Sequence, residues 1–189
     1  MEILEFNIKN MVCERCILVL EAALKALDLE VINVKLGKAQ VKRNGIKPSY
    51  MDIEKELNRF NFQLISPPDE IMVEKVKHIL LNLMNTHKID EINISDHISD
   101  TISKNYSQIS KTFSRIEGIT IEKFFIQLKI EKATEMISYE DQNFSQIAYT
   151  LGYKNLQHLS RQYKQVTGMT MSEYKNLNEN KRSGIDKVW

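Results

Sequence analysis

The chain has 189 residues, a formal net charge of +1 and a hydrophobic fraction of 42%. These values are typical of a soluble globular protein and exclude the disordered, collagen-like and disulfide-rich classes. The longest apolar runs, residues 17–20 and 79–81, fall far short of the roughly 20 residues that cross a bilayer. Residues 1–7 also lack the basic, apolar pattern of a signal peptide, so we expect a cytoplasmic protein without a membrane span.

Residues 1–65 alternate between two hydrophobic periods. A period of 2 predicts strands and a period of 3.6 predicts helices. Leu20, Ala23 and Leu24 form one helical stripe, and Gly37 marks a turn between two short strands. The resulting βαββαβ order is typical of a ferredoxin-like sandwich. We expect strands at residues 2–10, 31–36, 39–42 and 62–65, and helices at residues 16–27 and 49–60, the latter with Met51, Ile53, Leu57 and Phe60 on its apolar side.

Pro67 and Pro68 interrupt both periods, because proline lacks the backbone donor and constrains its predecessor. We therefore place a domain boundary there, giving domains 1–66 and 67–189. Beyond the boundary the pattern is helical, starting with a helix over residues 71–85. The expected fold is an α+β domain followed by an all-α domain.

Two segments of the helical half resemble each other and end in Gly118 and Gly168, which lie 50 positions apart. Residues 107–120 align with residues 156–170, and each segment ends in a glycine followed two residues later by threonine. Such a glycine ends a helix and such a threonine caps the next one. A short helix and a tight turn precede each segment, at residues 95–102 and 144–151. This arrangement predicts two helix-turn-helix units joined by a helix over residues 121–139.

The second helix of each unit has an inward apolar side, with Ile109, Phe113 and Ile116 in the first unit and Leu159, Tyr163 and Val166 in the second. The outward side carries bases and amides, which can contact phosphates and base edges of double-stranded DNA. The windows 101–116 and 142–172 contain three bases each and no acid. The candidate DNA-binding residues are Ser107, Gln108, Lys111, Thr112, Arg115, Asn155, Gln157, His158, Arg161, Gln162 and Lys164.

Residues 146–153 (QIAYTLGY) and 159–170 (LSRQYKQVTGMT) together resemble the carboxy-terminal signature of the AraC family of transcription regulators. The likeness covers about residues 70–178, and residues 128–133 (LKIEKA) resemble the family's linker helix. It implies a bacterial-type, sequence-specific DNA-binding regulator that works with RNA polymerase. The sequence has no glycine-rich phosphate loop and no base paired with a nucleophile, so we do not expect an enzyme. Two departures are Met171, where the family usually has proline, and residues 103–105 (SKN), where it has a small residue or glycine in the turn.

Cys13 and Cys16 lie between the first strand and the first helix. Cysteines this close in a cytosolic protein bind metal or take part in redox chemistry more often than they form a structural disulfide. We expect the helix dipole to lower their pKa values, which gives a soft site for Cu(I) or another thiophilic metal ion. Residues 11–16 (MVCERC) resemble the loop of heavy-metal-associated domains, with Met11 as the buried supporting methionine.

Several readings of the cysteine pair remain open. Residues 1–66 hold no histidine and no third cysteine, so a tetrahedral zinc site is incomplete; two-coordinate Cu(I) or a metal shared across a homodimer remains. The thiols could instead exchange disulfides, or could lack a ligand in a docking or dimerisation module. The leading hypothesis is a regulator responsive to a metal or to thiol state. Its rival is a cytosolic copper or heavy-metal carrier whose helical domain only docks partners.

Overall fold

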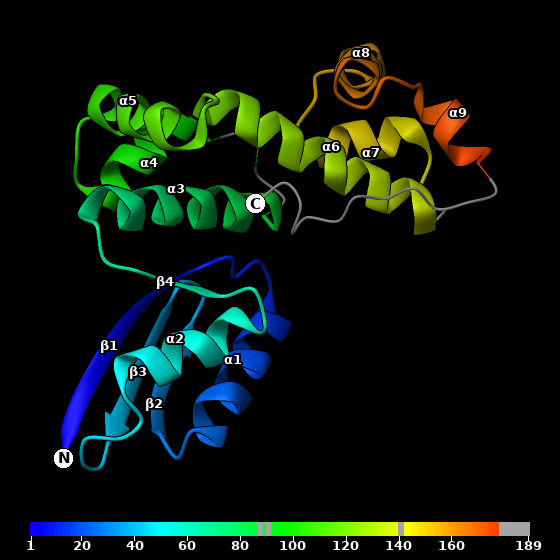
Figure 1. Ribbon diagram of the computed structural model, residues 1–189. Coiled ribbons are helices and arrows are strands. Elements are labelled where there is room, and N and C mark those ends of the chain that lie inside the picture. The colour runs from blue at the N-terminus through cyan, green and yellow to red at the C-terminus, as the bar shows by residue number, and fades with distance from the viewer. Residues whose placement is uncertain (87–88, 90–91, 140–141, 178–189) are drawn as a thin grey trace. The chain divides into compact units, whose positions relative to one another are not determined.

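A computed structural model describes residues 1–86, 89, 92–139 and 142–177 of the chain. The chain divides into two compact units, Met1–His78 and Ile79–Trp189. Figure 1 labels the helices and strands of both units. Within the described residues, no helix is long and apolar enough to span a membrane.

The first unit contains a four-stranded sheet whose strands lie in the order β2-β3-β1-β4. Every neighbouring pair is antiparallel, and Leu4 of the first strand lies opposite Val41 of the third. The elements follow the βαββαβ order expected from the sequence. They are β1 (Glu2–Lys9), α1 (Glu14–Ala26), β2 (Glu30–Lys35), β3 (Lys38–Arg43), α2 (Tyr50–Asn58) and β4 (Gln63–Ile65).

One face of this sheet and the two helices enclose a common hydrophobic core. Alternate strand residues, such as Phe6 and Val41, pack with Leu20 of α1 and with Ile53 and Leu57 of α2. Figure 1 shows both helices on the same side of the sheet. Because alternate strand residues point to opposite faces, the period of 2 in the sequence marks the buried face directly.

The expected apolar side of α2 was partly wrong. Ile53 and Leu57 are buried, but Met51 is 79% exposed and Phe60 is 43% exposed. Met51 lies two residues before Ile53, which turns it about 200° away around a helix of 3.6 residues per turn. Phe60 lies beyond the end of the helix at Asn58, where the helical period no longer applies.

Helix α3 (Pro68–Met84) begins at the second proline. Pro68 therefore does not interrupt the helix but starts it, since the first helical position needs no backbone N–H donor. The division between the two compact units falls inside this helix, between His78 and Ile79. The domain boundary at residues 66/67 stays a prediction.

The second unit is helical and is organised around one long central helix, α6. Helix α6 contacts α5, α7, α8 and α9, and Figure 1 shows these shorter helices distributed along it. Its bounds match the predicted connecting helix. The helices are α4 (Ile94–Ile102), α5 (Tyr106–Glu117), α6 (Ile121–Tyr139), α7 (Phe144–Thr150), α8 (Leu156–Thr167) and α9 (Met171–Lys175).

Candidate functional sites

The repeat seen in the sequence recurs in the ends of the helices. Helices α5 and α8 both end at a left-handed glycine, Gly118 with φ of 72° and Gly168 with φ of 80°. The next helix, α6 or α9, begins the same number of residues after the glycine in both units. Equivalent side chains 50 residues apart cap the starts of α4 and α7, of α5 and α8, and of α6 and α9: Asn93 and Asn143, Asn105 and Asn155, and Thr120 and Thr170.

The inward faces of α5 and α8 also match. Ile109 and Phe113 on α5, and Leu159 and Tyr163 on α8, are fully buried. Val166, which we expected to face inward, is 44% exposed. It follows Tyr163 by three residues near the end of α8, where the chain is about to leave the helix at Gly168, so little structure remains to cover it.

Most of the candidate DNA-binding residues are accessible. Half-buried side chains are Thr112, His158 and Gln162. The exposed ones are Ser107, Gln108, Lys111, Arg115, Asn155, Gln157, Arg161 and Lys164. The structure therefore brings eight of the eleven candidates to the surface on, or directly beside, the second helix of a helix-turn-helix unit.

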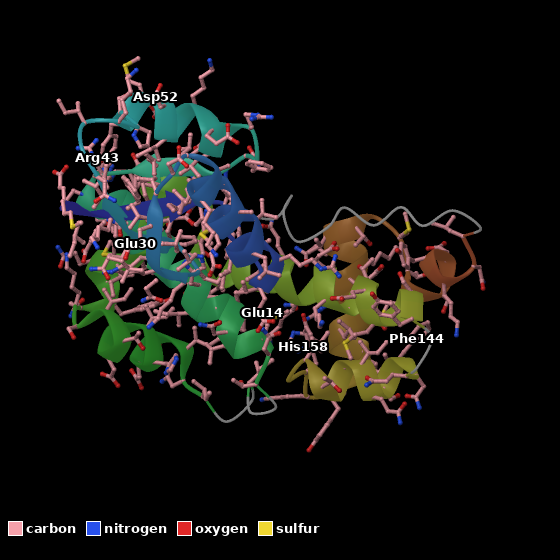
Figure 2. The ribbon with its side chains drawn as sticks, turned by 90° about the horizontal axis from the view of Figure 1, so that it is seen from below. Glu14, Glu30, Arg43, Asp52, Phe144 and His158 are labelled. Atoms are coloured by element: carbon pink, nitrogen blue, oxygen red, sulfur yellow. The ribbon has the colours of Figure 1, made fainter. Side chains whose placement is uncertain are left out.

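Asn155 and His158 also serve the local structure. The Asn155 side chain accepts a hydrogen bond of 2.9 Å from the backbone N–H of His158, which caps α8. The His158 ring, labelled in Figure 2, meets the Tyr153 ring edge-on at a centroid distance of 5.4 Å. Changing either residue would therefore disturb the start of α8 as well as any contact it makes with a ligand.

The charge on α8 favours an anionic ligand more clearly than the charge on α5. Helix α8 carries Arg161 and Lys164 and no acidic residue, while α5 carries Lys111 and Arg115 together with Glu117 at its end. A surface of bases and amides without acids attracts phosphates. Both helices fit that description over their first two turns.

Two polar anchors that the sequence analysis missed fix the helix-turn-helix units. The Tyr106 hydroxyl at the start of α5 donates a hydrogen bond of 2.7 Å to the Glu122 carboxylate on α6. Burial and this carboxylate raise the pKa of Tyr106, and the Tyr106 hydrogen bond lowers the pKa of Glu122. On α8, the Tyr163 hydroxyl lies 3.1 Å from the Thr134 hydroxyl of α6, and burial raises the pKa of Tyr163 to about 12.

The cysteine loop of the first unit brings two sulfur atoms together. The Cys13 and Cys16 Sγ atoms lie 3.7 Å apart, with Cys13 exposed and Cys16 half-buried. Cys13 is the N-cap residue of α1, immediately before Glu14, which Figure 2 labels. The expected lowering of thiol pKa by the helix is wrong for Cys16, because burial outweighs its backbone hydrogen bonds and raises its pKa.

The sulfur spacing fits part of a metal site. With a metal–sulfur bond of about 2.3 Å, two corners of a tetrahedron lie about 3.8 Å apart, while a linear pair lies about 4.6 Å apart. The observed 3.7 Å matches the tetrahedral edge. Over the described part of the chain, no group of three or more histidine, cysteine or acidic side chains is arranged to hold a metal ion. In the described residues, the loop therefore brings two sulfur atoms together without a third such side chain arranged beside them.

Comparison with known proteins finds a family of domains that matches part of the helical unit. Residues 98–177 match the family described as a helix-turn-helix domain. Over 117 residues the chain is 21% identical to an uncharacterised HTH-type transcriptional regulator, YdeC, of Bacillus subtilis strain 168. That alignment covers 62% of this chain and 40% of the relative, so the chain spans less than half the length of this relative. The family match shows that residues 98–177 carry a helix-turn-helix domain.

The solved structures to which this chain is similar include two transcriptional regulators. One is a DNA-binding transcriptional dual regulator from Escherichia coli K-12, with 18% identity, coverage of 59% of this chain and 92% of that chain, and a TM-score of 0.48. The other is a regulator with an AraC-type DNA-binding domain from Chromobacterium violaceum, with 17% identity, coverage of 58% and 98%, and a TM-score of 0.46.

Proposed function

We propose that this chain is a sequence-specific DNA-binding transcription regulator that inserts α5 and α8 into the major groove of one duplex. The observation that carries the proposal is the recurrence, 50 residues apart, of N-cap side chains, buried core positions and left-handed terminal glycines. Two copies of one binding element on a shared central helix match the two successive faces that a DNA duplex offers.

The length of the central helix supports this binding mode. Helix α6 has 19 residues, which span about 28 Å at 1.5 Å per residue. One turn of B-DNA is about 34 Å long. The turns that flank α6 add to this length, so α5 and α8 could enter two successive segments of the major groove. In this binding mode Lys111 and Lys164 contact phosphates, and Arg115 and Arg161 contact base edges.

Titration of the full chain against genomic DNA fragments, followed by fluorescence anisotropy, tests the proposal. We expect saturable binding to a subset of fragments, with an affinity that falls as salt rises because phosphate contacts release counterions. Lys164→Ala should weaken binding to all fragments alike and reduce the salt slope by about 1, while Arg161→Ala should reduce the preference among fragments. Equal, weak binding to every fragment would contradict a sequence-specific regulator.

For the first unit we propose a ferredoxin-like, heavy-metal-associated module that makes DNA binding responsive to a thiophilic metal. The βαββαβ order, the buried Met11 and the 3.7 Å sulfur spacing support this role. Cys13 and Cys16 would hold Cu(I) or a similar ion, which supplies a charged bridge between the two thiolates. If a second copy of the chain supplied a third donor, the metal site would form a homodimer contact. At promoters, the protein partner of the regulator would be RNA polymerase.

The alternative of a metal carrier is favoured by the exposure of Cys13, which leaves one sulfur accessible to an incoming thiol. Cu(I) transfer to a chelator of matched affinity separates the two roles. A carrier exchanges its ion within seconds and shows no specific DNA binding. A regulator retains specific DNA binding, with an affinity that differs between the apo and loaded forms.

A further inference from the structure

The loop that carries the cysteines is attached to α3 by a histidine. His78 Nε2 lies 2.9 Å from the backbone carbonyl oxygen of Met11. Because a carbonyl only accepts, Nε2 carries the hydrogen in this contact. Burial lowers the pKa of His78, which favours the neutral ring. His78 lies 67 positions from its partner in the chain, so no local sequence pattern indicates this contact.

The same peptide group also contacts a cysteine. The Met11 carbonyl belongs to the peptide bond that ends in the N–H of Val12, and this N–H donates to Cys16 Sγ at 3.5 Å. The carbonyl and the N–H of one planar peptide point in opposite directions and move together. His78 and the Cys16 sulfur are therefore partners of one rigid group, one on each side.

The His78 ring packs directly against Gly37. Gly37 has φ of +79°, and a Cβ atom built there would lie 2.5 Å from Cε1 of the His78 ring. Its N–H donates to the Met11 sulfur at 3.3 Å, and Met11 is fully buried. Any residue larger than glycine would displace the imidazole. His78, Met11 and Gly37 together form what we call the loop latch.

We propose that the loop latch transmits the state of the Cys13–Cys16 pair to α3 and through that helix to the DNA-binding unit. A metal-bound thiolate accepts more strongly than a thiol, so it would pull the Val12 N–H and polarise the attached carbonyl. The pull would change the hydrogen bond to His78. Helix α3 continues without a break from His78 to Met84 in the second unit. This regulatory role rests on the proposed function.

The test uses the full chain, Cu(I) added anaerobically at one equivalent, and backbone amide NMR of Val12 and residues 79–84. In the wild type we expect Cu(I) to shift both sets of amides and to change DNA affinity by at least about fivefold. In His78→Leu, Cu(I) should still shift Val12 but not residues 79–84, and DNA affinity should change less than about twofold. His78→Gln, which keeps an N–H donor, should restore part of the response.

His97→Leu is the matched control, because it makes the same substitution at an exposed histidine of α4; it should respond like the wild type. A response of residues 79–84 in His78→Leu equal to that of the wild type would overturn the latch, as would no response of these amides in the wild type. If the wild type shows no specific DNA binding, the proposed function is refuted. The amide shifts of residues 79–84 would still show whether the loop latch transmits the state of the cysteine pair to α3. If Cu(I) does not load the chain, the metal proposal fails, and Cys16→Ser in the wild-type and His78→Leu backgrounds provides the same comparison.

Discussion

The two helix-turn-helix units share a frame but differ in how they are anchored. In each, an aromatic residue of the second helix meets an aromatic residue of the following helix edge-on. The ring centroids are 5.6 Å apart for Phe113 and Phe124, and 6.4 Å apart for Tyr163 and Tyr174. The partners of one pair lie 50 residues from those of the other, so the same packing contact has been kept in both units.

The difference lies in the hydroxyl groups. The second pair carries two, and both contact α6, since Tyr163 lies 3.1 Å from Thr134 and Tyr174 lies 3.2 Å from Ser138. The first pair has none, and α5 is instead fixed at its start by Tyr106 and Glu122. A buried hydroxyl is usually paired, and Thr134 and Ser138 of α6 each pair with one tyrosine of the second pair. The two units therefore share one arrangement of helices, but different polar contacts attach them to α6.

The largest expected effect comes from removing the shared aromatic contact. Phe113→Ala and Tyr163→Ala should each lower the free energy of unfolding by about 3–5 kcal/mol, because both side chains are fully buried and leave a cavity. Urea denaturation followed by circular dichroism measures the loss. A loss below about 1 kcal/mol in either variant would show that the two units do not depend equally on this contact.

The next largest expected effect is on DNA affinity, which can be measured for each unit separately. Arg115→Ala on α5 and Arg161→Ala on α8 should each weaken specific binding by about 1–3 kcal/mol, since each removes one exposed base from the second helix of a separate helix-turn-helix unit. Fluorescence anisotropy on a preferred fragment measures both. Lys175→Ala on α9 removes an equal charge outside these helices and is the control. A full effect in the control would indicate general electrostatic attraction only.

The helix ends should respond alike. Gly118→Ala and Gly168→Ala should each cost about 1–2 kcal/mol, because both glycines are left-handed and an added Cβ meets nothing within 4 Å in either unit. The cost is then conformational alone. Ser103, which is left-handed with φ of 57° at the end of α4, gives the opposite test. Ser103→Gly should leave stability unchanged or raise it, and thermal unfolding distinguishes these signs.

The smallest effect concerns the polar anchor of α5. The hydrogen bond from Tyr106 lowers the pKa of Glu122 in the folded state, so it stabilises the fold above the ordinary carboxyl pKa and is lost as pH falls through the lowered value. Tyr106→Phe should therefore cost less than about 1 kcal/mol near neutral pH. The difference from the wild type should vanish on acidification. Urea denaturation at several pH values measures it, and a constant difference would contradict the mechanism.

Local patterns predicted most of the secondary structure. The period of 2 located the strands because one face of the sheet is buried, and the glycine–threonine spacing located the ends of α5 and α8. The connecting helix at residues 121–139 was predicted with its observed bounds. Met51 was wrongly placed because it lies on the opposite side of the helix from Ile53, whereas Phe60 lies beyond the end of α2 and Val166 lies near the end of α8.

The contacts between distant residues could not be predicted in the same way. The partner of His78 is 67 positions away and that of Tyr163 is 29 positions away. Neither spacing corresponds to a turn, a helix or a strand, so only the packed fold reveals these pairs. The exposed sides of α5 and α8 were largely predictable, because each lies opposite an apolar stripe. Which of their side chains contact bases stays a prediction.

The central claim is that both helix-turn-helix units bind the same DNA duplex. Methylation protection of guanine N7 atoms on a preferred DNA fragment tests it directly, since these atoms line the major groove. We expect two protected patches about 10 base pairs apart, one lost in Arg115→Ala and the other in Arg161→Ala. A single protected patch, or the loss of both patches in either variant, would contradict the account.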